Sequence, residues 1–369
     1  MPKVILYIVS TLGSSGPTNQ LYNILLNINR KEFKPKIITL SKEPKNSIYE
    51  DFEMLKIDIY SLGLSRLGFW FKGKRKLIKM VEELEPDIIH TSGYRGDRFA
   101  VKYLNKFKHC NTIHNFAYED YPMTYGKIIG KIMAENHIKA LSKMTYPIAC
   151  SYSITKKIKK CCNIHTYSIP NGVDEIYYSP ADELEKIRRR EKLGLNTRKK
   201  IFIFIGTMSN RKDPFTTIKS FQKANISSSA ILVLLGDGPL LKKCKKYNSE
   251  SIIVKGKVNN VREFLKSSDV FVSSSKSEGL PMAVLEAINC GLPIILSDIE
   301  SHREILSKNP IIGDKFRVGN IDELRELFKY YTKHYLEYKS KEARILGETF
   351  YSSKVMCDAY EKMYKQILK

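Results

Sequence analysis

Two glutamates on either side of a short turn are the residues of this sequence best spaced to do chemistry. Glu278 and Glu286 are separated by seven residues, and Gly279-Leu280-Pro281 directly follows the first of them. The apolar run at residues 270–272 predicts a buried strand just upstream, and Pro281 suits the first turn of a helix. We therefore expect Glu278 on a strand-to-helix loop and Glu286 about two turns into the helix.

This arrangement offers acceptors for hydroxyl groups and donors for phosphate. Carboxylates accept hydrogen bonds from hydroxyls, and backbone N–H groups at a helix N-terminus, here at Gly279 and Leu280, hold phosphate. Together they fit a ligand with sugar hydroxyls at one end, a diphosphate in the middle and a ribose at the other, which is a nucleotide-sugar. The alternative is an ordinary strand–helix unit with two solvated glutamates, and this segment alone does not separate the two.

The length and charge of the chain limit the classes of protein to which such a segment could belong. The chain has 369 residues, which is typical of two domains, and 43% of them are hydrophobic, enough for real cores. Lys and Arg number 62 against 39 Asp and Glu, so the formal net charge is +23. Such an excess favours an anionic partner, namely nucleic acid, an acidic lipid surface or a phosphorylated substrate, unless it is a bias of composition alone.

Cysteine spacing and hydropathy indicate the compartment. The seven cysteines form no CxxC pair, so neither a zinc site nor a disulfide framework is expected, and a reducing cytoplasm is favoured. No apolar run reaches the ~18 residues of a membrane span. The apolar start at residues 2–10 predicts a first strand rather than a signal peptide, because its core is too short.

Short apolar runs that alternate with helical patterns predict a parallel sheet with helices on both faces. The predicted strands of the first half are 4–9, 36–40, 87–90, 110–114 and 147–150. After a charged helical linker at 182–192 the alternation resumes, with predicted strands at 201–205, 231–235, 252–254, 270–273 and 293–297. We therefore predict two α/β domains, residues 1–178 completed by a C-terminal helix within 350–369, and residues 179–349.

Loops that follow predicted strands carry further candidate binding residues. The first strand leads into a loop with Gly13, Ser15 and Gly16, where glycines allow a phosphate to approach the backbone. Arg211 and Lys212 follow the strand at 201–205 and could neutralise a diphosphate. Two later loops could also reach a ligand, through Gly236 and through the backbone near Val258. The alternative for each loop is a simple turn, and only for the Arg211-Lys212 loop does the position after a strand favour a functional role.

A histidine and two basic stretches complete the candidates. His114 ends a predicted strand, where it could bond a sugar hydroxyl or assist proton transfer, although a lone histidine is more often structural. Residues 64–80 place Trp70 within a basic cluster, and residues 125–144 surround isoleucines with lysines. Such mixtures suit an anionic membrane surface. The alternative is a core helix with a solvated lysine face.

Taken in order, these segments resemble the family 4 glycosyltransferases of the GT-B fold over nearly the whole chain. The most specific element is the spacing of Glu278 and Glu286, which matches the family's E-x7-E motif. The supporting elements are the loop at 13–16, His114, Asn171 within the segment 170–174, the Arg211-Lys212 loop and the segment 236–239.

The resemblance implies two Rossmann-like, doubly wound domains that face a cleft, with the C-terminal helix packed back on the first domain. A nucleotide-sugar would bind mainly to the second domain. Glu278 would contact the hydroxyls of the donor sugar with His114 nearby, Lys212 would hold the diphosphate, and Glu286 would hold the ribose. The resemblance also implies retention of the anomeric configuration and no metal or other cofactor, since cations and helix dipoles stabilise the leaving group.

Two departures from the family pattern affect these expectations. Many members carry an arginine at the position of Thr207, so Arg211 would supply that charge here, or the diphosphate would be held less tightly. The first loop continues as Gly-Pro-Thr-Asn-Gln at 16–20 rather than the more frequent Gly-Gly-Ala-Glu-Arg type. The second change lies on the acceptor side and leaves the acceptor's identity open.

The sequence therefore predicts a retaining glycosyltransferase of the hexosyltransferase type, with a UDP-sugar favoured over a GDP-sugar as donor. Its acceptor would be a glycan, carried on a polyprenyl diphosphate, in bacterial surface polysaccharide synthesis such as that of O-antigen or capsule. The expected location is the cytoplasm, at the inner face of an anionic membrane, with no nucleic-acid partner. The alternatives are a UDP-sugar 2-epimerase of the same fold, a basic nucleic-acid-binding protein and a non-catalytic glycan-binding protein.

Overall fold

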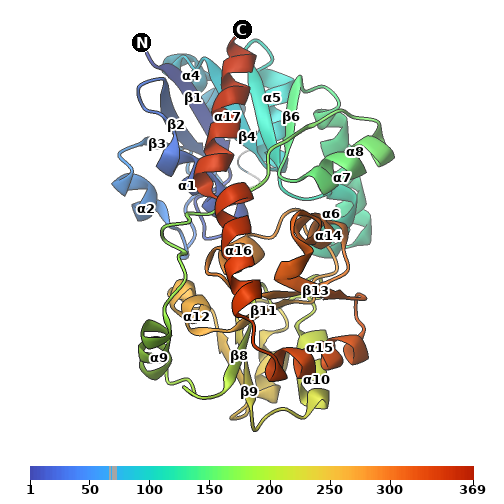
Figure 1. The fold of residues 1–369 in the computed structure, drawn as a ribbon. Helices are drawn as coiled ribbons and strands as arrows, with labels where there is room; N and C mark the ends of the chain where they lie inside the picture. Colours follow the sequence, from blue (N-terminus) through green and yellow to red (C-terminus); the bar gives the residue numbers. More distant parts are fainter. Residues whose placement is uncertain (66–67, 69–72) are drawn as a thin grey trace. The chain divides into compact units, whose positions relative to one another are not determined.

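A computed structural model describes residues 1–65, 68 and 73–369 (Figure 1). The chain divides into two compact units. Unit 1 comprises Met1–Gly172 together with Ser353–Lys369, and unit 2 comprises Val173–Ser352. Trp70 and most of the aromatic and basic residues around it, in the first stretch predicted to suit a membrane, lie outside the described residues.

Unit 1 is built on a seven-stranded parallel sheet of order β3-β2-β1-β4-β5-β6-β7. Its strands are β1 (Lys3–Val9), β2 (Phe33–Thr39), β3 (Asp58–Ser61), β4 (Ile88–Ser92), β5 (His109–Ile113), β6 (Tyr146–Ala149) and β7 (Tyr167–Ser168). Five of them were predicted. The two edge strands, β3 and β7, were not, because neither is buried enough to need an apolar run, and β7 has only two residues.

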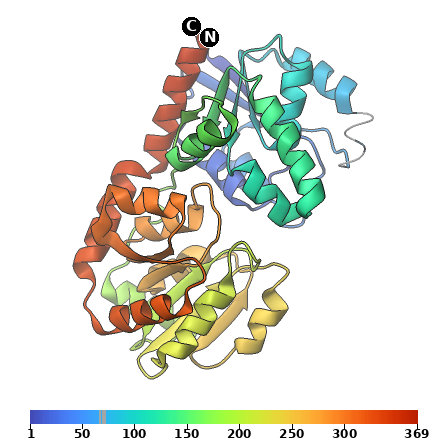
Figure 2. The same cartoon turned by 90° about the vertical axis from the view of Figure 1, so that its right-hand side faces the viewer.

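Helices cover both faces of this sheet (Figures 1 and 2). They are α1 (Gly16–Asn27), α2 (Tyr49–Met54), α4 (Lys74–Leu84), α5 (Tyr94–Tyr103), α6 (Ala117–Tyr125), α7 (Lys127–Leu141), α8 (Tyr152–Cys162) and the C-terminal α17 (Ser353–Leu368). Alternation along β1 assigns the two faces, since successive side chains of a strand point to opposite sides. Ile5 and Tyr7 pack in the core that includes α1 and α17, whereas Leu6 and Ile8 pack with α4 and α5.

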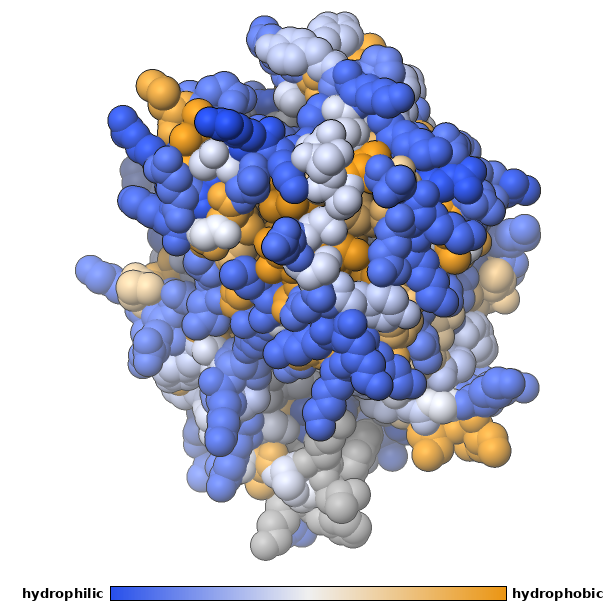
Figure 3. Space-filling model, turned by 90° about the horizontal axis from the view of Figure 1, so that it is seen from below, coloured by the Kyte–Doolittle hydropathy of each residue, from blue (hydrophilic) through white to orange (hydrophobic). Residues whose placement is uncertain are grey.

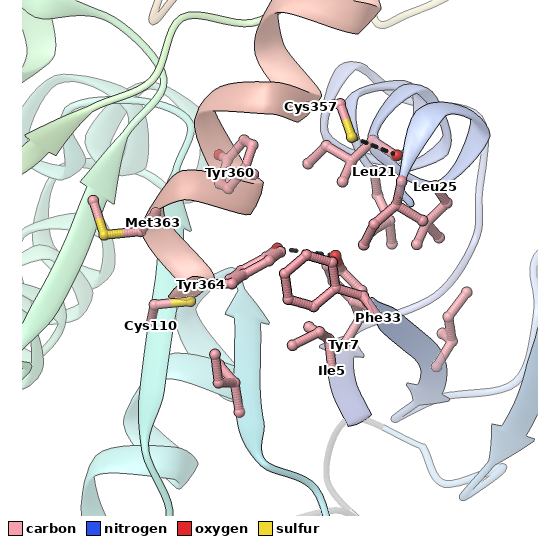
Figure 4. Packing of buried hydrophobic residues seen from close by; sticks show 14 of the residues in the cluster. Ile5, Tyr7, Leu21, Leu25, Phe33, Cys110, Cys357, Tyr360, Met363 and Tyr364 are labelled. Carbon is pink, nitrogen blue, oxygen red and sulfur yellow. Dashed lines mark hydrogen bonds between the residues drawn. The ribbon is translucent and has the colours of Figure 1, made fainter. Parts of the chain in front are cut away.

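The C-terminal helix is fastened to unit 1 by buried tyrosines (Figure 4). The Tyr364 hydroxyl lies 2.9 Å from the hydroxyl of Tyr7 and 2.7 Å from Nδ1 of His90. One helical turn earlier, the Tyr360 hydroxyl accepts a hydrogen bond of 3.0 Å from the amide of Gln20. The predicted packing of this helix on the first domain is thus confirmed, and its apolar face completes the core of unit 1.

Unit 2 repeats the architecture with a six-stranded parallel sheet of order β10-β9-β8-β11-β12-β13. Its strands are β8 (Lys200–Ile205), β9 (Ala230–Leu235), β10 (Ile252–Gly256), β11 (Val270–Ser273), β12 (Ile294–Ser297) and β13 (Gly313–Phe316). Five were predicted. The edge strand β13 was not, because its sequence Gly-Asp-Lys-Phe contains a single apolar side chain. The predicted fold class, two parallel-sheet Rossmann-like domains, is confirmed.

The helices of unit 2 connect these strands. They are α9 (Glu183–Lys192), α10 (Pro214–Ala224), α11 (Leu241–Cys244), α12 (Val261–Ser267), α13 (Met282–Asn289), α14 (Glu300–Lys308), α15 (Ile321–Lys333) and α16 (Glu337–Phe350), with short 3₁₀ turns at Lys245–Tyr247 and Pro310–Ile312. The predicted linker helix is α9. It begins after Asp182, whose carboxylate accepts a hydrogen bond from the backbone N–H of Glu185.

Hydrophilic side chains cover most of the face that Figure 3 shows. Figure 3 shows one face on which hydrophobic side chains appear only in small groups among hydrophilic ones. Within residues 1–65, 68 and 73–369, no helix is both long enough and apolar enough to cross a bilayer.

Candidate functional site

The candidate site of unit 2 lies at the carboxyl edge of its sheet. Because the paired strands are parallel, the loops that follow them emerge at one edge. The loop after β8 carries Arg211 and Lys212, and the loop after β11 carries Glu278. Since β8 and β11 are neighbours in the sheet, the two loops lie side by side.

The three charged side chains of these loops form one ion-paired cluster. The Lys212 ammonium lies 2.5 Å from Oε1 of Glu278, and the Arg211 guanidinium donates a hydrogen bond of 2.8 Å to Oε2. Arg211 also donates to the backbone carbonyl of Ser277, at 2.9 Å. Glu278 is therefore brought together with Arg211 and Lys212, which precede it by more than sixty positions, and all three were proposed from the sequence.

Electrostatics keep the Glu278 carboxylate ionised. Burial alone would raise its pKa, since the side chain is only 6% exposed. The positive charges of Lys212 and Arg211 outweigh this effect, and a hydrogen bond from Ser275 adds to them, so that the pKa of Glu278 falls to about 2. Glu278 is thus suited to accept hydrogen bonds from hydroxyl groups, and is unsuited to donate a proton near neutral pH.

Hydrogen bonds between the two loops hold the cluster in place. The Ser274 hydroxyl lies 2.7 Å from the backbone carbonyl of Asp213 and 3.2 Å from that of Lys212. The backbone N–H of Lys276 donates to the carbonyl of Arg211 at 2.8 Å. These hydrogen bonds therefore fix the positions of the two cations and the carboxylate relative to one another.

Glycines let the loops after β8 and β9 meet closely. Gly236 adopts a φ of +135°, and a Cβ at this position would lie 1.9 Å from the carbonyl oxygen of Gly206. Any larger residue at position 236 would therefore push the two loops apart. The N–H of Gly236 also donates to the carbonyl of Gly256 at 2.8 Å, and Val258 follows two residues later, partly buried.

Glu286 lies in helix α13, nearer to the start of the helix than the sequence suggests. The helix begins at Met282, so Glu286 is its fifth residue, a little more than one turn from the start rather than two. Pro281 is the N-cap residue, not part of the first turn, with an extended ψ of 112°. Gly279 and Leu280 immediately precede it in the same loop. The prediction that Glu278 lies on the loop and Glu286 in the helix is thus confirmed, but the predicted distance of Glu286 from the start of the helix is too long by nearly one turn.

The environment of Glu286 differs from that of Glu278. Its side chain is also buried, and burial raises its pKa to about 7, against a hydrogen bond from Tyr178 and the charge of Lys212, which both lower it. Lys212 is thus close enough to act on the carboxyls of Glu278 and Glu286 alike. Lys212 pairs directly with Glu278, and its charge also lowers the pKa of Glu286.

Sequence reasoning missed three residues around this cluster. Tyr178 contacts Glu286, Ser275 contacts Glu278, and the buried His302 is influenced by the charge of Glu278. Burial lowers the pKa of His302 to about 4, and its Nδ1 lies 2.8 Å from the backbone carbonyl of Ser297. No periodicity or motif marks these positions. Tyr178 and His302 are distant in sequence from the glutamates that they influence, whereas Ser275, three residues before Glu278, is one of several serines in the same loop.

The other predicted residues belong to unit 1. His114 directly follows β5, and its Nε2 lies 2.8 Å from the hydroxyl of Ser92, at the end of β4. Burial lowers the pKa of His114 to about 4, despite the opposing charge of Asp97, so the ring is neutral near pH 7. A neutral imidazole can exchange hydrogen bonds with a hydroxyl group.

The loop after β1 and the segment near residue 171 have clear structural roles. Ser15 is the N-cap of α1 and accepts a hydrogen bond from the N–H of Thr18, Gly16 is the first residue of that helix, and Gly13 forms an isolated bridge with Ser47. Asn171 is buried, and its N–H donates to the carbonyl of Cys150 at 3.2 Å. Their predicted contacts with substrate stay predictions.

A cavity in unit 2 lies away from this cluster. Its volume is about 750 Å³, and its walls include Lys200, Asp269 and Leu292, which lie at the start of strands β8, β11 and β12. It therefore opens at the amino edge of the sheet. Among the described residues that line it, none is a predicted site residue.

No three His, Cys, Asp or Glu side chains gather as a metal-binding group within the part of the chain that the structure describes. Lys212 and Arg211 place positive charge directly on the Glu278 carboxylate. The expectation that the reaction needs no metal stays a prediction.

Sequence comparison identifies the family. Residues 185–346, which include the whole cluster of Arg211, Lys212, Glu278 and Glu286, match the family described as glycosyl transferases group 1. An Escherichia coli UDP-Gal:α-D-GlcNAc-diphosphoundecaprenol α-1,3-galactosyltransferase is 31% identical over 67% of this chain, and the match spans 66% of that relative. The E. coli O-antigen biosynthesis glycosyltransferase WclY is 24% identical over 99% of both chains. The chain belongs to the group 1 glycosyltransferases.

Solved structures agree on the fold. HepE of Anabaena, crystallised with UDP and glucose, superposes with a TM-score of 0.83 over 98% of this chain and 99% of its own, at 13% identity. WaaG, a glycosyltransferase involved in lipopolysaccharide biosynthesis, gives a TM-score of 0.75 with the same coverage at 12% identity. The resemblance to the GT-B fold inferred from the sequence is confirmed.

Proposed function

We propose that this protein moves a sugar from a nucleotide-sugar, UDP-linked rather than GDP-linked, to a hydroxyl group of a glycan, with retention of the anomeric configuration. The observation that carries the proposal is the cluster at the carboxyl edge of unit 2, where Glu278 meets Lys212 and Arg211 and the charge of Lys212 also reaches Glu286. One site thus offers carboxylates for hydroxyl groups and cations for a diphosphate.

In the proposed reaction, the bond between the anomeric carbon and the diphosphate breaks and a bond to the acceptor oxygen forms. The nucleoside diphosphate leaves, and the acceptor hydroxyl gives up its proton. Lys212 would stabilise the charge that develops on the leaving group, and Arg211 would supply the cation that Thr207 does not. Since these side chains provide the charge, transfer is expected to persist in excess EDTA.

The two carboxylates have separate roles in this proposal. Glu278, held ionised by its cations, would accept hydrogen bonds from the donor sugar, and Glu286 would accept them from the ribose. The neutral imidazole of His114 in unit 1 would bond a hydroxyl group of a substrate. The loop with Gly13 and Ser15 would serve the acceptor.

Relatives support the choice of donor and acceptor. The first E. coli relative is named for transfer from UDP-Gal to GlcNAc-diphosphoundecaprenol, and HepE was crystallised with UDP and glucose. We extend this chemistry to the present chain. Its acceptor would be a glycan on a polyprenyl diphosphate, and its process the assembly of a bacterial surface polysaccharide, O-antigen or capsule, on the cytoplasmic face of the membrane.

Calorimetric titration with UDP-, GDP- and ADP-sugars tests the proposed donor. One UDP-sugar is expected to bind, and Glu286→Ala should weaken its binding about tenfold or more, since a hydrogen bond to a charged group is lost. Glu183→Ala, which removes an exposed glutamate on α9, is the matched control and should bind as the wild type does. Equal affinities of the wild type and Glu286→Ala would place the nucleotide elsewhere.

Product analysis separates transfer from the alternative functions. With a lipid-linked acceptor, NMR of the product should show the anomeric configuration of the donor sugar. Formation of an epimer from UDP-N-acetylglucosamine without acceptor would instead indicate an epimerase. Salt-sensitive RNA binding without binding of any nucleotide-sugar would indicate a nucleic-acid-binding protein.

The proposed location at a membrane rests on an exposed apolar surface of unit 1. Helix α7 carries Ile128, Ile129 and Ile132, which are 78%, 61% and 53% exposed, and their spacing places them on one side of the helix. Exposed Lys127 and Lys131 lie on the same turns. Helices α6 and α7 lie side by side in Figures 1 and 2. Apolar side chains ringed by lysines fit the surface of an anionic bilayer.

Flotation with phosphatidylglycerol vesicles tests this surface. The double variant Ile129→Asp/Ile132→Asp should bind the vesicles at least about tenfold more weakly than the wild type. It removes apolar area that would be buried in the bilayer, and its carboxylates are repelled by the anionic lipid headgroups. Its affinity for the UDP-sugar should be unchanged. Leu184→Asp, at an exposed leucine of α9, is the control and should float like the wild type. Failure of the wild type to float at low salt would refute membrane docking.

A further inference from the structure

The cavity at the amino edge of unit 2 is lined by cations from several elements. They are Lys186 of α9, Lys200 at the start of β8, Lys266 of α12, and Lys341 and Arg344 of α16. Carboxylates line the same cavity. The charges that remain without a partner of opposite sign therefore decide what the cavity can bind.

Several charges of the cavity wall are already paired within unit 2. The Asp269 carboxylate lies 2.6 Å from the Lys186 ammonium, and an arginine of the same helix donates to it as well. The Glu337 carboxylate lies 2.7 Å from the Lys341 ammonium. Arg344 is paired with a carboxylate one turn further along its own helix. These pairs account for three of the five cations.

The other carboxylates of the wall lie at the start of α9. Asp182 is the N-cap of this helix and accepts a hydrogen bond of 2.7 Å from the backbone N–H of Glu185. The side chain of Glu183 is 86% exposed and lies 3.9 Å from the Lys186 ammonium. The acidic residues of the wall thus have partners of their own.

Two lysines of the wall have neutral partners only. Lys266 donates a hydrogen bond of 3.2 Å to the hydroxyl of Ser179. Lys200 donates hydrogen bonds of 2.9 Å to the backbone carbonyls of Tyr331 and His334. Among the residues that the structure describes, no carboxylate forms an ion pair with either ammonium. The wall therefore presents two ammonium groups that lack a counterion.

Burial makes this arrangement costly for the protein alone. Lys266 is only 9% exposed. Burial lowers the pKa of Lys266 and that of Lys200, because a desolvated ammonium group is disfavoured. An anion in the cavity would offset this cost, since it would supply the charge that both lysines lack.

The rest of the wall indicates that such an anion has an apolar part. Leu292 and Leu336 are buried residues that line the cavity, and Ile345 of α16 lines it as well. The volume of about 750 Å³ lies within the range of pockets that hold small organic molecules. An inorganic ion would leave most of this space and the apolar surface unused.

We propose that the amino-edge cavity of unit 2 binds a small organic phosphate monoester, whose phosphate is neutralised by Lys266 and Lys200 and whose apolar body packs on Leu292 and Leu336. A monoester carries about two negative charges near neutral pH, which matches two ammonium groups. Lysine binds phosphate as a point charge. The site lies at the edge of the sheet opposite Glu278, so the proposal does not depend on the proposed function.

Calorimetric titration of the full-length protein with phenyl phosphate tests the proposal. Phenyl phosphate should bind more tightly than inorganic phosphate, which lacks the ring, and phenol, which lacks the charge, should not bind. Lys266→Met should weaken the binding of phenyl phosphate about tenfold or more, because a charge-assisted contact is lost. Lys219→Met is the matched control, since Lys219 is an exposed lysine of α10 outside the cavity, and it should bind as the wild type does.

Two further variants locate the bound anion. Ser340→Phe adds a ring to the cavity wall and removes no charge, and it should also weaken the binding of phenyl phosphate about tenfold or more. Lys212→Met removes a cation of the Glu278 cluster and should leave this binding unchanged. Circular dichroism melting confirms that each variant folds.

The outcomes separate the cavity from the Glu278 cluster. Loss of phenyl phosphate binding in Lys212→Met, with wild-type affinity in Lys266→Met, would place the anion at the cluster and overturn the proposal. Equal affinities of Lys266→Met and Lys219→Met would also overturn it, as would wild-type affinity in Ser340→Phe or the absence of phenyl phosphate binding by the wild type.

Discussion

Replacing Glu278 with glutamine should lower kcat by about 10²–10³-fold without raising the donor KM. Glutamine keeps the shape of the side chain but removes the charge, and losing one preorganised electrostatic group commonly costs this much. The carboxylate pairs with Lys212 and Arg211, so these cations would be left without their carboxylate partner and available to the diphosphate. Donor binding should therefore be retained or tightened while turnover collapses.

Steady-state kinetics with saturating acceptor check this expectation. Glu263→Gln is the matched control, because Glu263 is also an ion-paired glutamate of unit 2 but pairs with Arg189 and Arg262 at helix α12. The control should keep kcat within about twofold, as surface substitutions usually do. A wild-type kcat for Glu278→Gln would show that the charge of Glu278 plays no part in the reaction. An equal loss of kcat in Glu263→Gln would show that removing any ion-paired carboxylate of unit 2 has this effect, so that the loss is not specific to Glu278.

Replacing Asp97 with alanine should destabilise unit 1 by about 3–5 kcal/mol, the range found when one partner of a buried charged network is removed. The carboxyl of Asp97 is fully buried at the start of α5. It accepts hydrogen bonds from Thr91 at 2.5 Å and Asn111 at 2.9 Å, and lies 2.8 Å from Nε2 of His137. Alanine would leave three buried polar groups without this partner.

Urea unfolding followed by circular dichroism measures the loss. Asp58→Ala is the control, because Asp58 is an exposed aspartate on the edge strand β3 of the same unit, and it should change stability by less than about 0.5 kcal/mol. The Asp97 network continues through His137, whose Nδ1 lies 2.7 Å from the Tyr121 hydroxyl of α6. Unit 1 should therefore lose the packing of α6 and α7 along with its stability. An unchanged midpoint for Asp97→Ala would show that the network is dispensable.

Most of the fold could be predicted from local pattern. Strands such as β1 and β8 are buried on both faces over most of their length, and after an initial lysine their residues form uninterrupted apolar runs. Edge strands such as β3 and β13 contain no such run, and their sequences are too polar to stand out. The start of α13 was misplaced because Pro281 can occupy either the N-cap or the first turn, and neighbouring contacts decide which.

The sequence by itself determined the parallel α/β architecture, the linker helix, the closing C-terminal helix and the residues of the E-x7-E spacing, since each depends on periodicity or on residue types close together in the chain. Only the tertiary structure decided that Lys212 and Arg211 pair with Glu278, that Tyr178 contacts Glu286, and that one glutamate has a pKa near 2 and the other near 7. The physical reason is that ion pairing and desolvation depend on distances of a few ångströms between segments far apart in sequence, and such distances exist only once the chain has folded.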